Sequence, residues 1–158
     1  SLLIEDYAKG ARSSFPVCVV SLPFSQTLSA NWHLISWPHQ EGISKTELQA
    51  QCNPSYFSPD EPTLQAGKAY WVSVPSQCTL SKTGTPWNFT PVNLKSWLWT
   101  LIGAPFKEVL LKDILGTCTL NSLYLYQYDG YYSFSDRLRP GYGYYIMTTG
   151  NDCTLKLP

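Results

Sequence analysis

The residues that could carry catalysis or bind a metal are few, and their spacing suits neither role. The two histidines, His33 and His39, lack metal-ligand spacing, and no pair of the five cysteines forms a Cys-x-x-Cys sequence, so a zinc site is not expected. No Gly-x-Ser-x-Gly sequence presents a serine nucleophile. We expect His33 on the solvent side of a strand, and His39 in a loop where it could titrate near neutrality. The sequence therefore predicts no metal, no cofactor and no enzymatic activity.

The carboxylates do not form the opposed pair that glycoside hydrolysis requires. Asp60 and Glu61 are adjacent and lie between prolines, which is typical of a solvated turn. Asp129 is explained by a turn, and Glu47 and Asp113 are explained by helices. These positions favour structural roles for the acidic residues.

Composition excludes several classes of protein. The chain has 158 residues, 11 Lys and Arg against 11 Asp and Glu, and 15% aromatic residues. Zero net charge argues against nucleic-acid binding, which needs a basic surface. No apolar run approaches the roughly 18 residues of a transmembrane helix, so no membrane span is expected. The length fits one domain or two small ones.

An internal repeat organises the chain. Four blocks recur in the same order: 32–38 with 99–105, 43–52 with 109–118, 64–72 with 138–146, and 78–80 with 153–155. The second copy carries an insertion of about eight residues between the second and third blocks. Such self-similarity indicates two copies of one structural unit.

The repeat predicts the domain organisation and the fold class. We expect an N-terminal lead-in and strand at 1–26, with a buried strand over Phe15–Phe24, a first β module at 27–81, a linker at 82–91 and a second β module at 92–158. The predicted fold is mainly β and resembles a sandwich or barrel, with one short α-helix per copy. A pseudo-two-fold axis should relate the copies, which should pack as one unit because each alone would be marginally stable.

The short helices have sequence signals of different strength. In the first copy Ser44 and Glu47 form a capping box, with Ile43 and Leu48 as a hydrophobic staple. In the second copy Gly116 is a natural stop. The apolar residues expected on one face of that helix are Phe106, Val109, Leu110 and Ile114.

The insertion predicts a β-hairpin with a tight turn. Asp129-Gly130 lies between two aromatic runs, and this dipeptide favours a type I′ turn. Since alternate strand residues share a face, Tyr124, Tyr126 and Tyr128 should form an aromatic strip. Leu123 and Leu125 should point into the core.

The repeat also pairs four of the cysteines. It makes Cys52–Cys78 and Cys118–Cys153 equivalent, each joining the end of a short helix to the start of the last strand. It leaves Cys18 as a buried free thiol, with an intermolecular disulfide as the alternative. Structural disulfides persist in oxidising compartments, which predicts an extracellular or cell-surface location. Asn88 begins an Asn-x-Thr sequence and is a candidate for glycosylation.

The order of the motifs resembles a β-rich module of prokaryotic cell-surface and secreted proteins. Its usual form is GWNLIG.P, then Y.YD, then L.PG.GYWV, and the resemblance covers both copies. Ser36 and Ala69 replace glycines of this pattern in the first copy, where the Y.YD sequence is absent. The resemblance implies a cell-surface or secreted location and a non-catalytic role.

Residues that match between the copies are expected to be core, as for Trp32, Trp99, Tyr70 and Tyr144. Unmatched aromatic residues are freer to bind a partner and are expected to be more exposed. These are Trp37, Trp87, Trp97, Tyr124, Tyr126, Tyr128, Tyr131 and Tyr132. We expect a structural, assembly or attachment module that contacts other protein subunits or cell-surface components. The alternative is a carbohydrate-binding module, in which exposed rings stack on glycans.

Overall fold

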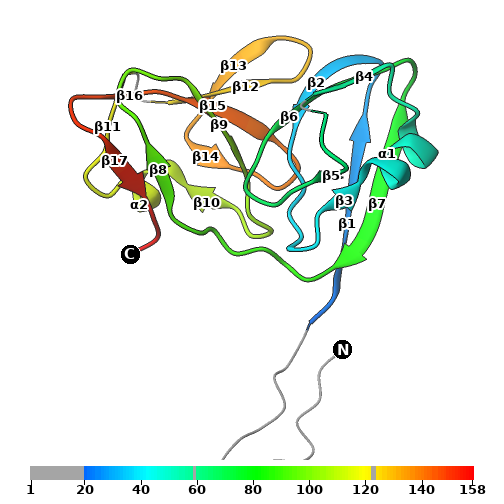
Figure 1. The fold of residues 1–158 in the computed structure, drawn as a ribbon, viewed down its shortest axis with the longest axis horizontal. Coiled ribbons are helices and arrows are strands. Elements are labelled where there is room, and N and C mark those ends of the chain that lie inside the picture. Colours follow the sequence, from blue (N-terminus) through cyan, green and yellow to red (C-terminus); the bar gives the residue numbers. More distant parts are fainter. Residues whose placement is uncertain (1–19, 59, 122–123) are drawn as a thin grey trace, which may run out of the picture.

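The structure is a computed structural model that describes residues 20–58, 60–121 and 124–158. Over these ranges the chain is mainly β, with several small sheets and two short helices, as predicted. The first half of the chain lies at the right of Figure 1 and the second half at the left, joined by a segment that runs along the bottom. The β12–β13 hairpin rises at the top, between the two halves.

The first half, residues 22–84, begins and ends with strands that pair with each other. Its elements are β1 (Leu22–Leu28), β2 (Asn31–Ile35), β3 (Ile43–Ser44), α1 (Lys45–Cys52), β4 (Tyr56–Ser58), β5 (Thr63–Leu64), β6 (Tyr70–Val74) and β7 (Cys78–Gly84). Strand β1 is antiparallel to β7 along its full length, β2, β6 and β4 form a three-stranded sheet, and β3 pairs with β5.

The second half contains one larger sheet. Its elements are β8 (Val92–Leu94), β9 (Thr100–Gly103), β10 (Val109–Leu110), α2 (Leu111–Ile114), β11 (Thr119–Leu120), β12 (Leu125–Tyr128), β13 (Tyr132–Ser135), β14 (Arg137–Leu138), β15 (Gly143–Ile146), β16 (Thr148–Thr149) and β17 (Cys153–Leu155). The sheet order is β13-β12-β15-β9, while β8 pairs with β17, β10 with β14, and β11 with β16.

The N-terminal strand and the linker differ from their predicted extents. Residues 15–19 of the predicted buried strand lie outside the described residues. Strand β1 begins at Leu22 and is largely solvent-exposed, because it pairs at its edge with β7 and buries mainly Leu28. Strand β7 runs through Gly84, so the first residues of the predicted linker are strand.

Helix α1 confirms the predicted capping box. The Ser44 side chain accepts a hydrogen bond from the Glu47 backbone N–H at 3.0 Å, and the Glu47 carboxylate accepts one from the Ser44 N–H at 2.8 Å. Ile43 and Leu48 are fully buried beside this cap. The capping box therefore fixes where the chain changes from strand to helix.

Helix α2 is shorter than the sequence predicted. Val109 and Leu110 form strand β10 opposite Leu138 and Arg137, so the helix begins only at Leu111. The spacing of the apolar residues before Leu111 is ambiguous, because a short apolar run is compatible with a strand as well as with a helix. Gly116 has a φ of +56° directly after the helix, as expected for a helix stop.

The predicted hairpin is present, but the prediction of a type I′ turn was wrong. Tyr128 pairs with Tyr132, so the loop contains three residues and not two. The backbone N–H of Asp129 donates to the carbonyl of Tyr131 at 3.2 Å, and Gly130 supplies the positive φ of +82°. The side chain of Asp129 also bonds to His33 of the first half at 2.9 Å, which constrains the loop.

Both predicted disulfides are present, Cys52–Cys78 and Cys118–Cys153. The first connects the end of α1 to β7, and the second connects the loop after α2 to β17. Cys18 lies outside the described residues. Each half has its own buried hydrophobic cluster, and each cluster contains one half of a disulfide at Cys52 or Cys118.

The two halves approach each other through residues with small side chains. The backbone N–H of Ser36 donates to the carbonyl of Gly141 at 3.0 Å, and the N–H of Gly103 donates to the carbonyl of Gly67 at 2.9 Å. A Cβ atom added to Gly143 would lie 2.6 Å from the Cβ of Ala69. The backbones can therefore meet only because side chains are absent or minimal there.

The disulfides should each contribute substantially to stability. Replacing Cys52 and Cys78 together by serine should lower the free energy of unfolding by about 3–4 kcal/mol, because the bridge closes a loop that restricts the unfolded chain. Urea unfolding followed by circular dichroism measures the change. The double serine variant of Cys118 and Cys153 is the matched comparison, and a loss under about 1 kcal/mol in both variants contradicts this account.

The contact at Gly143 should tolerate no methyl group. Gly143→Ala should lower the free energy of unfolding by about 1–3 kcal/mol, as expected for overpacking. Adding Ala69→Gly to this variant should restore part of the loss, because it removes the opposing Cβ. Denaturant midpoints of the wild type, both single variants and the double variant measure the coupling. If the two substitutions destabilise additively, the two positions do not oppose each other.

Candidate functional site

The structure places aromatic rings in a continuous surface over the two main sheets. Eight rings follow one another in space, and the centroids of each neighbouring pair lie 4.9–6.3 Å apart. In spatial order from the first half they are Tyr56, Trp32, Trp71, Tyr145, Trp99, Tyr126, Phe134 and Tyr124. Tyr128 joins this chain through Trp71, and Tyr132 joins it through Tyr128. We call these ten residues the aromatic surface.

Strand register explains why these rings share one side. Tyr126 is opposite both Tyr145 and Phe134, and Tyr128 is opposite Tyr132. Paired residues in antiparallel strands point to the same face. Leu125 points to the other face and is fully buried. The predicted tyrosine strip on β12 is therefore confirmed, whereas Leu123 lies outside the described residues.

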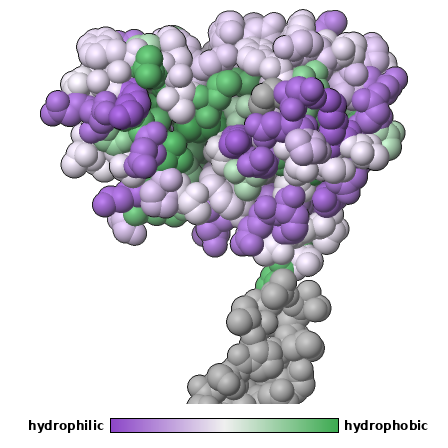
Figure 2. Space-filling view, in the orientation of Figure 1, coloured by the Kyte–Doolittle hydropathy of each residue, from purple (hydrophilic) through white to green (hydrophobic). Residues whose placement is uncertain are grey.

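The aromatic surface carries few strongly hydrophilic side chains. In Figure 2 the top of the molecule, over β12, β13, β2 and β4, is mostly pale, and strongly hydrophilic residues gather mainly lower and toward both sides. Tyr131 and Tyr132 in the hairpin, and Phe134 on β13, are among the most exposed aromatic side chains of the described chain. This part of the protein surface is suited to contact with a partner.

Two predicted core residues are in fact on this surface. Trp32 is 40% exposed and Trp99 is 49% exposed, whereas Tyr70 and Tyr144 are fully buried as predicted. Trp32 lies opposite Ser73 on the outer face of its sheet and packs sideways against Tyr56. The predicted match between Trp32 and Trp99 therefore did not show which face of each sheet is covered.

Two predicted binding residues are buried, and the prediction for them was wrong. Trp37 is 0% exposed, donates from its indole N–H to His39 Nδ1 at 3.1 Å, and packs edge-on against Phe24. Trp87 is 8% exposed and lies over Gly67, where a Cβ atom would be 3.1 Å from its ring. Both indoles fill space near the contact between the halves. Trp97, in contrast, is exposed as predicted, in a turn with a φ of +64°.

Several residues of the aromatic surface were not selected from the sequence. They are Trp71, Tyr145, Tyr56 and Phe134. Trp71 and Tyr145 directly follow the buried Tyr70 and Tyr144. Because strand residues alternate between faces, that position was a signal for an outward ring.

Four rings of the aromatic surface line an open hollow of about 400 Å³. They are Trp99, Tyr126, Tyr132 and Tyr145, and we call this hollow the ring pocket. The hydroxyl of Tyr145 accepts a hydrogen bond from the indole of Trp71 at 3.0 Å. Burial, with smaller contributions from Tyr145 and Tyr128, raises the pKa of Tyr132 above its ordinary value.

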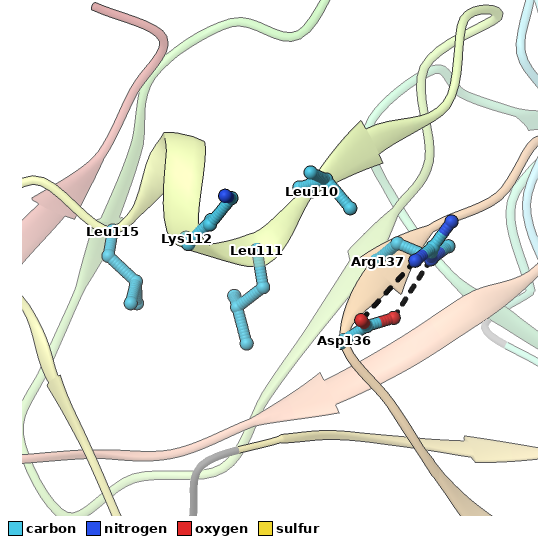
Figure 3. Close-up of a pocket in the computed structure, with 6 residues that line it drawn as sticks. All are labelled: Leu110, Leu111, Lys112, Leu115, Asp136 and Arg137. Carbon is cyan, nitrogen blue, oxygen red and sulfur yellow. Dashed lines mark hydrogen bonds and ion pairs between the residues drawn. The ribbon is translucent and has the colours of Figure 1, made fainter.

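A second hollow of about 340 Å³ lies beside α2 and β14, with Leu110, Leu111 and Leu115 among its lining residues (Figure 3). Arg137 and Asp136 face it and bond to each other, with Nε donating to Oδ1 at 2.8 Å and Nη2 donating to Oδ2 at 3.3 Å. The hydrogen bond from Arg137 lowers the pKa of Asp136. Arg137 and Asp136 thus neutralise each other within the site, which favours a structural role for this pair, and Lys112 also lines the hollow.

Ser29, His33 and Asp129 have the connectivity of a hydrolase triad, but their geometry does not suit catalysis. Nδ1 of His33 is 2.9 Å from Asp129, and Nε2 is 3.4 Å from the Ser29 hydroxyl. Nε2 is also only 2.7 Å from the Ser29 carbonyl. Donation to that carbonyl needs a proton on Nε2, which prevents it from accepting the hydroxyl proton. His33 is buried, not on the solvent side as predicted, because the hairpin covers it.

His39 is also buried, although the sequence placed it in a loop. It stacks against Phe106, with ring centroids 5.6 Å apart. Burial lowers the pKa of His39 below its ordinary value. A neutral imidazole packed between aromatic rings serves the core and has no access to a substrate.

The bond between Asp129 and His33 should hold the hairpin against the first half. Asp129→Ala should lower the free energy of unfolding by about 1–3 kcal/mol, because it leaves a buried imidazole nitrogen without its acceptor. Asp129→Asn should cost less, because it keeps an oxygen acceptor and the turn preference. Urea unfolding measures both, with Asp113→Ala on α2 as a surface control. Equal stability of the Ala and Asn variants would contradict a role for the hydrogen bond.

Comparisons with known proteins do not extend this description. No protein-family model, no curated protein and no solved structure matches this chain. Within the ranges that the structure describes, no helix is long and apolar enough to cross a membrane. The same ranges contain no group of three or more His, Cys, Asp and Glu residues placed to hold a metal ion.

Proposed function

We propose that this chain is a non-catalytic module of an extracellular or cell-surface protein, with a structural, assembly or attachment role. The observation that carries the proposal is the aromatic surface, which continues across both main sheets. Cores of protein interfaces are depleted in charge and enriched in Tyr and Trp. A low-charge surface of ten aromatic residues is suited to burial against another protein subunit.

We also infer that the two halves are tandem copies related by a pseudo-two-fold axis. In support, residues that match in the repeat face each other across the contact. Trp71 donates to its match Tyr145 at 3.0 Å, and His39 stacks on Phe106, where each of these two residues directly follows the first matching block of its copy. Two backbone hydrogen bonds between the halves, from Ser36 to Gly141 and from Gly103 to Gly67, also join matching positions. Mutual contact between equivalent residues is the mark of two-fold packing.

The proposed location is supported by the disulfides and by one exposed asparagine. Two disulfides in one small chain suit an oxidising compartment. Asn88 is exposed, so an oligosaccharide could be attached there without unfolding the chain. Glycosylation itself stays a prediction.

A carbohydrate-binding module is the second candidate. It is favoured by the exposure of Trp97 and Trp99, which are 60% and 49% exposed and close in sequence. Indole faces open to solvent can stack on sugar rings. This candidate places the partner at Trp97 and at Trp99 of the aromatic surface.

Light scattering and a glycan array separate the two candidates. We expect the wild type to associate, and the double variant Tyr132→Ser with Phe134→Ser to associate at least about tenfold more weakly, since hot-spot aromatics each contribute roughly 2 kcal/mol. Both side chains are mostly exposed, so the midpoint of urea unfolding should change little. Leu157→Ser, at an exposed position near the C-terminus, is the matched control.

Three other results would change the proposal. A monomer that binds a glycan would make the carbohydrate module the better function. A monomer with no glycan ligand would contradict both candidates. Association that is unchanged in the double variant would exclude strand β13 from the interface.

A further inference from the structure

We propose that the ring pocket binds a quaternary ammonium group of the trimethylammonium type, as choline carries. This inference rests on the proposed attachment role, and it names the chemical group that the aromatic surface recognises. The pocket is lined by Trp99, Tyr126, Tyr132 and Tyr145. The angles between these rings determine the shape of the pocket. The absence of charged side chains from the lining determines which cations it favours.

The rings stand as walls and not as a flat platform. The plane of Trp99 is inclined 82° to Tyr126 and 86° to Tyr145, with centroids 5.3 Å and 6.1 Å apart. Tyr132 completes the lining from strand β13. Rings at right angles form a corner in which a compact, roughly spherical group can contact several rings at once. A flat sugar ring needs a single open face.

The walls are held in place by residues that do not line the pocket. Tyr126 packs against Phe134 with centroids 4.9 Å apart, and Tyr132 packs against Tyr128 at the same distance. The Trp71 indole fixes the Tyr145 hydroxyl. Binding would therefore cost little side-chain entropy.

The electrostatics of the lining favour a cation without N–H groups. Ring faces carry the negative part of the aromatic quadrupole and attract a cation within about 6 Å. All four lining residues are aromatic, so the lining offers no carboxylate or amide to a primary ammonium or a sugar hydroxyl, and its only side-chain polar groups are the tyrosine hydroxyls and the indole N–H. A quaternary ammonium loses little hydrogen bonding when it leaves water.

The test varies the charge of the ligand and the methylation of its nitrogen separately. Choline, tetramethylammonium, ethanolamine and the neutral carbon isostere of choline are each titrated into the protein while tryptophan fluorescence and calorimetric heat are recorded. We expect choline and tetramethylammonium to bind at least about tenfold more tightly than the isostere and ethanolamine, as desolvated cation–π contacts allow. Equal affinity for choline and its isostere, or no binding of choline, overturns the proposal.

Variants of Tyr132 locate the site. Tyr132 is 59% exposed on an edge strand, so its replacement should not unfold the chain. Tyr132→Leu should weaken choline binding at least about fivefold, whereas Tyr132→Phe should stay within about twofold because it keeps the ring. Trp97→Leu, outside the pocket, is the control. If Tyr132→Leu binds choline as the wild type does, the cation does not occupy the ring pocket.

The two proposals can fail separately. If the wild type associates but does not bind choline, the proposed structural role stands and only the proposed ligand is rejected. If the wild type binds choline but does not associate, assembly is rejected as the function of the aromatic surface. A glycan hit that Tyr132→Leu abolishes would assign the pocket to carbohydrate and overturn the cation proposal.

Discussion

The structure depends on the close approach of two backbones where its halves meet. Ser36 and Gly103 each donate a hydrogen bond to a carbonyl of the other half, and a Cβ on Gly143 would collide with Ala69. Any larger side chain here would separate the sheets. Because they stay close, Trp71 can reach Tyr145, and two groups of rings become one surface. The aromatic surface is thus a consequence of small residues that lie beneath it.

Polar bonds beneath the rings keep that surface rigid. The hydroxyls of Tyr70 and Tyr144 accept hydrogen bonds from the backbone N–H groups of Gln65 and Arg139, both at 2.9 Å. Burial raises the pKa of each tyrosine to about 12, so both remain neutral donors and acceptors up to strongly basic pH. Buried polar groups are costly unless they are paired, and these pairs fix the strands that carry Trp71 and Tyr145.

The sequence predicted local features well because local chemistry determines them. The capping box of Ser44, the disulfides, the hairpin at Asp129 and the tyrosine strip follow from spacing and alternation. It failed for Trp32, Trp37, Trp87 and His33, whose exposure depends on contacts between distant segments. Alternation shows which residues share a face of a sheet, but not what covers that face. The hairpin covers His33 and residues near the contact between the halves enclose Trp37, while no such contact encloses Trp32.

The two halves carry similar rings but do not form the same pocket. In the first sheet β4 lies next to β6, as β12 lies next to β15 in the second, and Tyr56 packs against Trp32 much as Tyr126 packs against Trp99. Only the second sheet has a further strand, β13, which supplies Tyr132 to the lining. Strand β13 therefore adds a wall to an arrangement of rings that both sheets contain. A corner of rings is present in both halves, but within the described residues it forms a pocket only in the second. For this reason we propose that the second half binds the ligand and that the first half supports it structurally.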